Sequence, residues 1–143
     1  MSAQALGIVH GLVLGLTTLL GVGWCLMHFW QAHINWPIVT PACGGAFRKR
    51  VTLLALLTWA TALSGWALAG RSDAPWDLWL LWKASSGLVS ALSLSLTALS
   101  AWRVGDQGFG RRTWRVRWLS GLILAQGGGL LAALLGALSH YLR

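Results

Sequence analysis

Acidic residues are nearly absent from this chain of 143 residues, which has three Asp and no Glu. Charged residues of both signs make up only 10% of the sequence, whereas soluble domains carry about a quarter. A water-soluble globule is therefore excluded. Intrinsic disorder is excluded too, because disordered chains are poor in apolar residues, while this one is 56% hydrophobic with a mean hydropathy of +0.63. The composition indicates an integral membrane protein with a single domain, residues 1–143.

Cysteine is also scarce, and the two present, Cys25 and Cys43, do not make a disulfide framework. Cys25 lies inside an apolar run, and Cys43 lies in a loop that we assign to the reducing, cytoplasmic side. No Cys-x-x-Cys-His motif occurs, which excludes covalent attachment of a c-type haem. Paired carboxylates and a Walker-type phosphate loop are missing as well, so nothing indicates a hydrolase.

The net charge of +8 arises from the lack of acids rather than from a basic surface. Lys and Arg gather in short clusters between apolar runs, which is typical of topology signals and lipid head-group contacts. A nucleic-acid-binding face would need base-stacking aromatics beside the basic residues. We therefore expect membrane lipids as partners and no nucleic acid.

Four stretches are long enough to cross a bilayer, which takes about 20 mostly apolar residues. We predict transmembrane helices over residues 3–30, 47–69, 75–102 and 113–142. Pro and Gly between 31 and 46 predict a loop there, and the Asp73-Ala-Pro-Trp segment predicts a helix start. The short connections predict an all-α, up-down-up-down bundle of four transmembrane helices.

Two basic loops set the predicted orientation. Arg48, Lys49 and Arg50 follow the first loop. Five arginines lie in the connection between the third and fourth helices and at the start of the fourth, namely Arg103, Arg111, Arg112, Arg115 and Arg117. By the positive-inside rule both loops face the cytoplasm and both termini face the outer, periplasmic side. This pattern predicts a multi-pass protein of a bacterial inner membrane. Most of the eleven Trp residues are expected to be interfacial anchors. On the inner side these are Trp30, Trp36, Trp102, Trp114 and Trp118.

Two histidines share one face of the first helix. His10 and His28 are five full turns apart, so they lie roughly 27 Å from each other along the helix axis. Thr17, Gly21 and Trp24 lie between them, with Cys25 to one side. Small and polar residues on this face favour its turning into the bundle rather than toward lipid.

The third and fourth helices have matching stripes at helical spacing. The third-helix stripe starts at Lys83 and continues through Ser, Gly and Thr, and the fourth runs from Gln126 through small residues to His140. In the predicted orientation His10, Lys83 and His140 converge in the outer half of the membrane. An ionisable residue inside a membrane is a functional candidate. Imidazole, and a lysine amine in its uncharged form, can serve as axial ligands of haem.

Another set of residues has side chains that are soft metal ligands and indicates copper binding instead. These are Cys25, Met27, His28, His33 and Cys43, and thiolate, thioether and imidazole suit Cu(I). His10, His28 and Cys25 are the candidate metal ligands.

Each of these candidate ligands can also have a purely structural role. His10 can hydrogen-bond a neighbouring helix, Lys83 can extend to the interface, and Cys25 can simply pack. His33 and His140 can lie at the interface as well.

The sequence resembles four-helix membrane proteins of the CopD copper-resistance family and the HemJ protoporphyrinogen oxidase family. The similar segments are His10, FRKRVTLLALLTWATALSGWALAG entering the second helix, WLLWKASSGLVSALSLSLTALSAWR with Lys83, and RRTWRVRWLSGLILA opening the fourth. The HemJ resemblance implies that His10 and Lys83 are a functional pair associated with haem b. The CopD resemblance implies copper uptake across the inner membrane.

The function expected from the sequence is binding of a tetrapyrrole, haem b, with one-electron transfer between a quinone or porphyrinogen and a partner protein. His10 is the first expected ligand, Lys83 the second, and His140 a substitute for Lys83, with a second site near His28. The first alternative is a non-catalytic accessory subunit of a larger respiratory or photosynthetic membrane complex. The second is CopD-like copper handling.

Overall fold

The computed structural model describes residues 2–33, 41–71, 78–108 and 111–141, with the backbone alone at 31–33, 41–43, 79, 107 and 139–141. Four long helices make up nearly all of this part of the chain. They are α1 (Ala3–His33), α2 (Pro41–Ala69), α3 (Leu78–Val104) and α4 (Arg112–Tyr141), and a short 3-10 helix, η1 (Asp106–Gly108), precedes α4. The all-α prediction is confirmed for these residues.

Each long helix contains a stretch apolar and long enough to cross a membrane. The four spans are Ala3–Trp30, Gly44–Ala69, Leu80–Val104 and Arg112–Leu138. They agree with the four predicted helices to within a few residues at most of their ends. The chain is therefore a multi-pass membrane protein by helix length and composition.

The start of α2 differs from the prediction, which left residues 31–46 as a loop. The helix begins at Pro41 instead of 47, because proline is accepted in the first turn of a helix, where its missing N–H has no partner to lose. Gly44 does not break the helix either. A Cβ atom there would collide with the backbone carbonyl of Asp106, so glycine serves the close approach of η1. Residues 34–40 and 75–77 lie outside the described residues.

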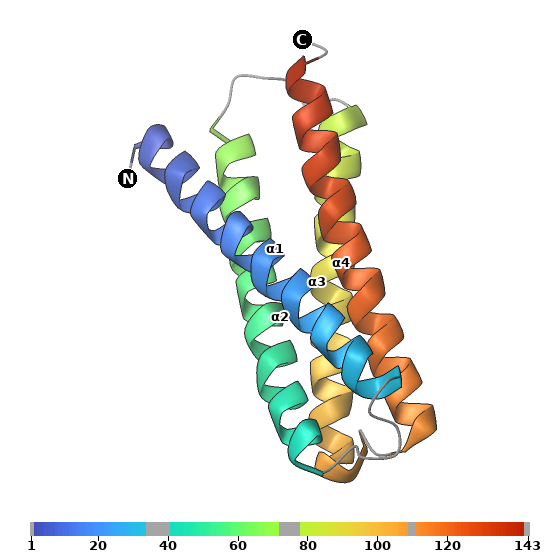
Figure 1. The fold of residues 1–143 in the computed structure, drawn as a ribbon. Coiled ribbons are helices and arrows are strands. Elements are labelled where there is room, and N and C mark those ends of the chain that lie inside the picture. Colours follow the sequence, from blue (N-terminus) through green and yellow to red (C-terminus); the bar gives the residue numbers. More distant parts are fainter. Residues whose placement is uncertain (1, 34–40, 72–77, 109–110, 142–143) are drawn as a thin grey trace.

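Figure 1 shows how the helices lie against each other. The first residues of α1 and the last of α4 lie at one end, called the terminal end below. The opposite end, called the basic end, holds Arg48, Asp106 and Arg112. Helix α1 crosses α2 obliquely and approaches α4 toward the basic end, while the α1–α2 and α3–α4 pairs spread apart toward the terminal end (Figure 1).

Hydroxyl groups join the helices across their facing sides. From α3, Ser90 donates to the Ala125 carbonyl at 2.6 Å and Ser93 donates to the Gly121 carbonyl at 3.0 Å on α4. The Trp59 indole of α2 donates to Ser95 of α3 at 3.0 Å. Such bonds help to hold helices together where lipid leaves little hydrophobic driving force.

The tightest core lies toward the basic end, around Phe47 and Trp118. Their rings stack with centroids 5.4 Å apart, and the Trp118 indole N–H donates to Ser100 at 2.7 Å. The prediction of Trp118 as an interfacial anchor is therefore wrong, since only 1% of it is exposed. Its place is fixed by α2, which presents Phe47 to it. Trp30 and Trp102 are exposed as predicted, Trp114 is half-buried, and Trp36 lies outside the described residues.

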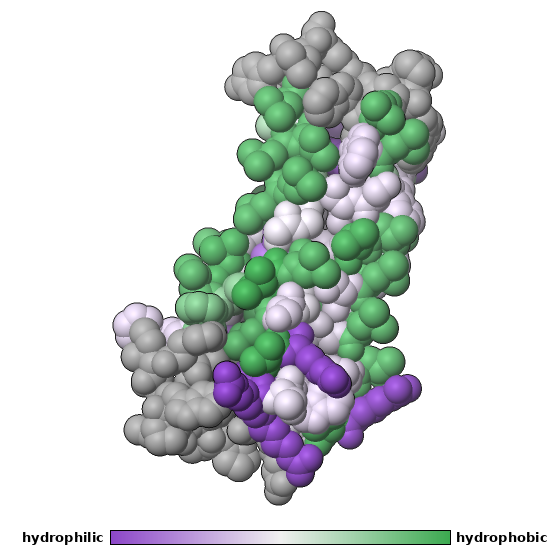
Figure 2. All heavy atoms as spheres, turned by 90° about the vertical axis from the view of Figure 1, so that its right-hand side faces the viewer, coloured by the Kyte–Doolittle hydropathy of each residue, from purple (hydrophilic) through white to green (hydrophobic). Residues whose placement is uncertain are grey.

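Positive charge gathers at the basic end. Figure 2 shows strongly hydrophilic side chains at this end of one face, below a largely apolar surface. Arg48 pairs with Asp106 and lies over the Trp102 ring, 4.5 Å from its centroid. Arg117 lies 5.2 Å from the centroid of Trp114. Guanidinium groups over indole rings are typical of a membrane–water boundary, where an amphipathic ring and a cation meet.

Candidate functional site

A cavity of about 340 Å³ lies between the four helices on the side of the terminal end. Every residue that lines it belongs to one of the four membrane spans. Its walls are mostly apolar and include four glycines and seven alanines. The glycines are Gly65, Gly87, Gly129 and Gly136.

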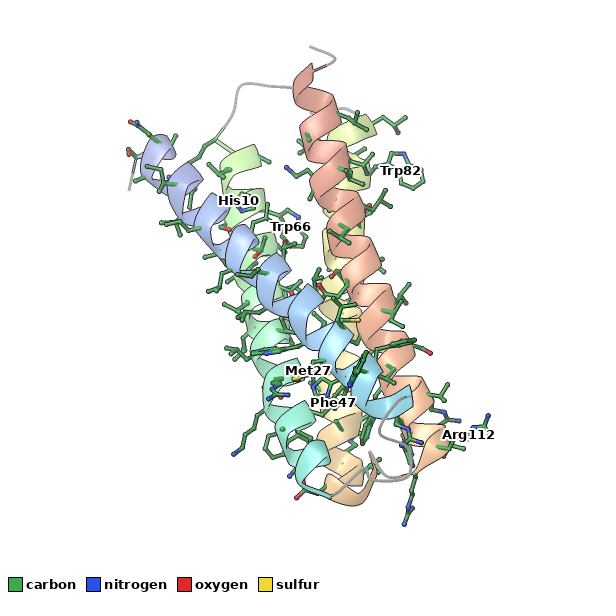
Figure 3. All side chains as sticks on the ribbon, viewed as in Figure 1. His10, Met27, Phe47, Trp66, Trp82 and Arg112 are labelled. Atoms are coloured by element: carbon green, nitrogen blue, oxygen red, sulfur yellow. The ribbon has the colours of Figure 1, made fainter. Side chains whose placement is uncertain are left out.

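His10 of α1 and Lys83 of α3 both line this cavity. The polar faces on which the sequence places these two residues therefore border the same cavity. In Figure 3, His10 and Trp66 lie near each other toward the terminal end, well away from Phe47.

Glycines on α2 and α4 leave the room that the two bases occupy. A Cβ atom at Gly65 would lie 3.0 Å from Cε1 of His10, and one at Gly136 would lie 3.0 Å from Nζ of Lys83. Both distances are shorter than an ordinary van der Waals contact. Gly136 belongs to the stripe predicted on the fourth helix, whereas the role of Gly65 was not predicted.

His10 is held by α2 through a hydrogen bond. Its Nδ1 lies 2.9 Å from Oγ of Ser64, and the Ser64 hydroxyl donates to the Thr61 carbonyl at 3.0 Å. Sequence reasoning missed Ser64. The available signal was the Ser-Gly pair, Ser64 and Gly65, close to the end of an apolar helix.

Polar groups also line the part of the cavity nearest the basic end. The hydroxyl oxygens of Thr17 and Thr61 lie 3.3 Å apart, and Thr58 lies one turn closer to the start of α2. The Gln126 carboxamide of α4 packs directly against Gly21 of α1. This contact marks where α1 and α4 come together and where the cavity ends.

The other predicted site residues whose side chains the structure describes are not brought to this cavity. His28 is 1% exposed and packs edge-on against Phe47, with ring centroids 5.0 Å apart, inside the aromatic core. Cys25 is half-buried beside the same core. The side chains of His33, Cys43 and His140 lie outside the described residues.

Copper ligands do not gather in the described part of the chain. Within residues 2–33, 41–71, 78–108 and 111–141, no three of His, Cys, Asp and Glu come together as a metal ion requires. Met27, a member of the soft set, accepts an N–H···S contact from Arg50 at 3.4 Å. Nothing in this geometry favours the copper reading over the tetrapyrrole reading.

Comparison with known proteins gives no match: no family model fits the chain, and no curated protein or solved structure is similar to it. The function is therefore inferred from the cavity and the residues around it.

Proposed function

We propose that this chain binds a tetrapyrrole, haem b, in the membrane cavity, where His10 would be the first residue to hold the iron and Lys83 the second. The observation that carries the proposal is that these two nitrogen bases, from α1 and α3, line one cavity inside the membrane spans. Imidazole is the commonest axial ligand of haem. His140 stays an alternative to Lys83, because it belongs to the predicted stripe of small and polar residues on α4 that runs from Gln126 toward the terminal end.

The walls of the cavity suit a flat apolar group. Small-molecule sites are mostly apolar clefts of roughly 300–1,000 Å³ with a few placed polar groups, and this cavity has about 340 Å³. A Cβ atom at Gly87 would meet nothing within 4 Å, so that part of the wall faces open space. The second tetrapyrrole expected near His28 is not part of the proposal, since Phe47 and Trp118 fill that region.

The cavity is open on a side that faces lipid. Trp66 and Leu130 line it and are 36% and 44% exposed, and both lie within membrane spans. A molecule that reaches it this way comes through the hydrocarbon layer. The redox partner we propose is accordingly bilayer-soluble, a quinone or a porphyrinogen. Haem b supplies one-electron transfer when bound, while the chain binds and orients it and excludes water.

The proposed orientation follows from the charges at the two ends. The basic end faces the cytoplasm of a bacterial inner membrane, both termini face outward, and the helices run up-down-up-down. The cavity then lies in the outer half of the bilayer. The orientation can be tested with Ser2→Cys in a variant that lacks Cys25 and Cys43. The new thiol should react with an impermeant maleimide added to intact spheroplasts. A reaction that occurs only after lysis would place the N-terminus on the cytoplasmic side and contradict the proposed orientation.

Removal of each ligand tests the proposal. Purified in mild detergent from haem-producing cells, the protein should show a b-type spectrum on reduction. His10→Ala should abolish it, while Lys83→Met should leave bound haem with a changed spectrum, because the imidazole, the first ligand, remains. Leu12→Ala, at a residue of α1 that is 69% exposed, should leave the spectrum unchanged.

The outcome for His10→Ala decides between ligation and a structural role. A folded His10→Ala protein with a full, unaltered haem spectrum would rule out His10 as a ligand. A colourless wild-type protein that does not take up added haemin would rule out the whole proposal.

One observation favours the alternative of an accessory subunit. Gly7, Gly11 and Gly15 form a row on α1, and a Cβ atom at any of them would meet nothing within 4 Å. Rows of small residues let a second transmembrane helix approach closely. If the chain is such a subunit, a Gly11→Leu substitution should release a co-purifying membrane protein, whereas the haem spectrum should not depend on this residue.

A further inference from the structure

We infer that Ser64 is a positioning residue that fixes the tautomer of His10, leaving the lone pair on Nε2. The inference deepens the proposed function and rests on it for its consequence in ligand binding. The tautomer itself is a property of the chain without any ligand, so it can be measured separately.

The hydrogens available to these groups decide the direction of each bond. A serine hydroxyl has a single proton to donate. The Ser64 hydroxyl donates it to the Thr61 carbonyl, 3.0 Å away. The contact of 2.9 Å between Ser64 Oγ and His10 Nδ1 must then have the ring N–H as its donor.

The opposite direction would leave one contact without a proton. If Nδ1 carried no hydrogen, the single Ser64 proton would have to serve both Nδ1 and the Thr61 carbonyl, which can only accept. The two contacts are satisfied together only when the ring N–H is at Nδ1.

The neighbours of His10 on other elements favour the neutral ring in this tautomer. Gly65 of α2 lies against the ring, where a Cβ atom would come within 3.0 Å of Cε1 and 3.7 Å of both nitrogens. Lys83 of α3 is the other basic residue that lines the same cavity. Among the described residues that line the cavity, none is acidic.

The consequence for binding follows from what a metal ligand needs. A ligating histidine commonly donates its other ring N–H to an acceptor, which sets the tautomer and the ring orientation. Here the donor is Nδ1, so Nε2 is the nitrogen offered to iron. Loss of such a partner typically costs about 10–100-fold in metal affinity. We expect a loss of about tenfold for Ser64→Ala, the lower end of that range.

Nitrogen NMR of the ligand-free protein tests the tautomer directly. Histidine labelled with ¹⁵N gives distinct shifts for a protonated and an unprotonated ring nitrogen, and His10→Ala identifies the His10 signals. The expected result is a protonated Nδ1 and an unprotonated Nε2 in the wild type, with a mixture of tautomers in Ser64→Ala. A protonated Nε2 in the wild type would overturn the inference. An unchanged tautomer in Ser64→Ala would overturn the role of Ser64.

Haemin titration of three variants tests the consequence. Ser64→Ala should weaken binding about tenfold and make the reduction potential more positive, because the ring loses an acceptor that makes it electron-rich. Ser64→Thr, which keeps the hydroxyl, should restore both. Ser85→Ala is the matched control, since Ser85 is exposed and donates only to the Leu81 carbonyl of its own helix.

The two measurements separate the inference from the function on which it rests. If NMR shows the expected tautomer and no variant binds haemin, the proposed function fails while the assignment of the tautomer stands. If haemin binds and Ser64→Ala has the affinity and potential of the wild type, the role of Ser64 in binding fails while the function stands.

Discussion

Trp118 and Ser100 join α4 to α3 by a side-chain hydrogen bond of 2.7 Å, and the Trp118 ring also stacks on Phe47 of α2. One side chain therefore ties together three helices. Arg115, which is 3% exposed, and Leu122 are also buried on the inward side of α4. The position of these groups explains why the region around His28 is full and the region around His10 is not.

Removing the Trp118 ring should destabilise the bundle strongly. Truncation of a buried Trp costs roughly 3–5 kcal/mol in soluble proteins, and we expect about 2 kcal/mol here because lipid already solvates apolar groups in the partly unfolded protein. Trp118→Ala should shift the midpoint of unfolding by sodium dodecyl sulfate in mixed micelles. Trp82→Ala, at a residue that is 59% exposed, is the control and should shift it little. Equal shifts for the two variants would contradict the packing described for Trp118.

Single residues were predictable where helical spacing alone decides their direction. His10, Thr17, Gly21 and His28 share a face, and that face does turn into the bundle. Ser64 and Gly65 were not predicted as partners of His10, because which residue of α2 lies opposite depends on how the two helices cross. Trp118 was misplaced for a related reason. A tryptophan near a helix end is typical of the interface, and only the position of Phe47 makes it part of the core.

At the scale of helices, α1 meets α4 at a close contact between Gly21 and the Gln126 carboxamide. Glycine at such a crossing lets two backbones approach. Because the atoms in contact belong to the flexible end of a glutamine, a methyl group at this position can be accommodated by a movement of Gln126. A larger side chain should push α1 away from α4.

The comparison of two glycines on α1 tests this contact. Gly21→Leu should lower the stability in detergent and lengthen the distance between spin labels on α1 and α4. Gly23→Leu adds the same side chain two residues away, where a Cβ atom meets nothing within 4 Å, and should change neither. A distance that stays the same in Gly21→Leu would show that this crossing does not depend on a small residue.

The four helices themselves were predictable, because each apolar run is long enough for a membrane span and has few charges. Their ends were less so. Proline and glycine at 41–45 favour a loop in the sequence, yet α2 starts at Pro41 and uses Gly44 for contact with η1. At this end of the bundle the packing of α2 against η1 decides the start of the helix, rather than the low helix propensity of proline and glycine.

At the scale of the whole molecule, the cavity exists because the two helix pairs spread apart toward the terminal end (Figure 1). Individual stripes of small and polar residues can be recognised in the sequence. The angle between the pairs cannot, since it depends on contacts such as those of Gly21 and Trp118. The convergence of His10 and Lys83 was therefore expected from their depth in the membrane, while the residues that form the walls of the cavity between them were not all predictable.

The central claim is that a tetrapyrrole binds in this cavity, and haem content after filling the cavity tests it most directly. Gly87→Phe keeps both ligands and places a ring where a Cβ atom meets nothing within 4 Å. Gly23→Phe, also in open space but outside the cavity lining, is the matched control. The account predicts about one haem b per chain in the wild type and Gly23→Phe, and little or none in folded Gly87→Phe. Full haem content in Gly87→Phe would contradict it.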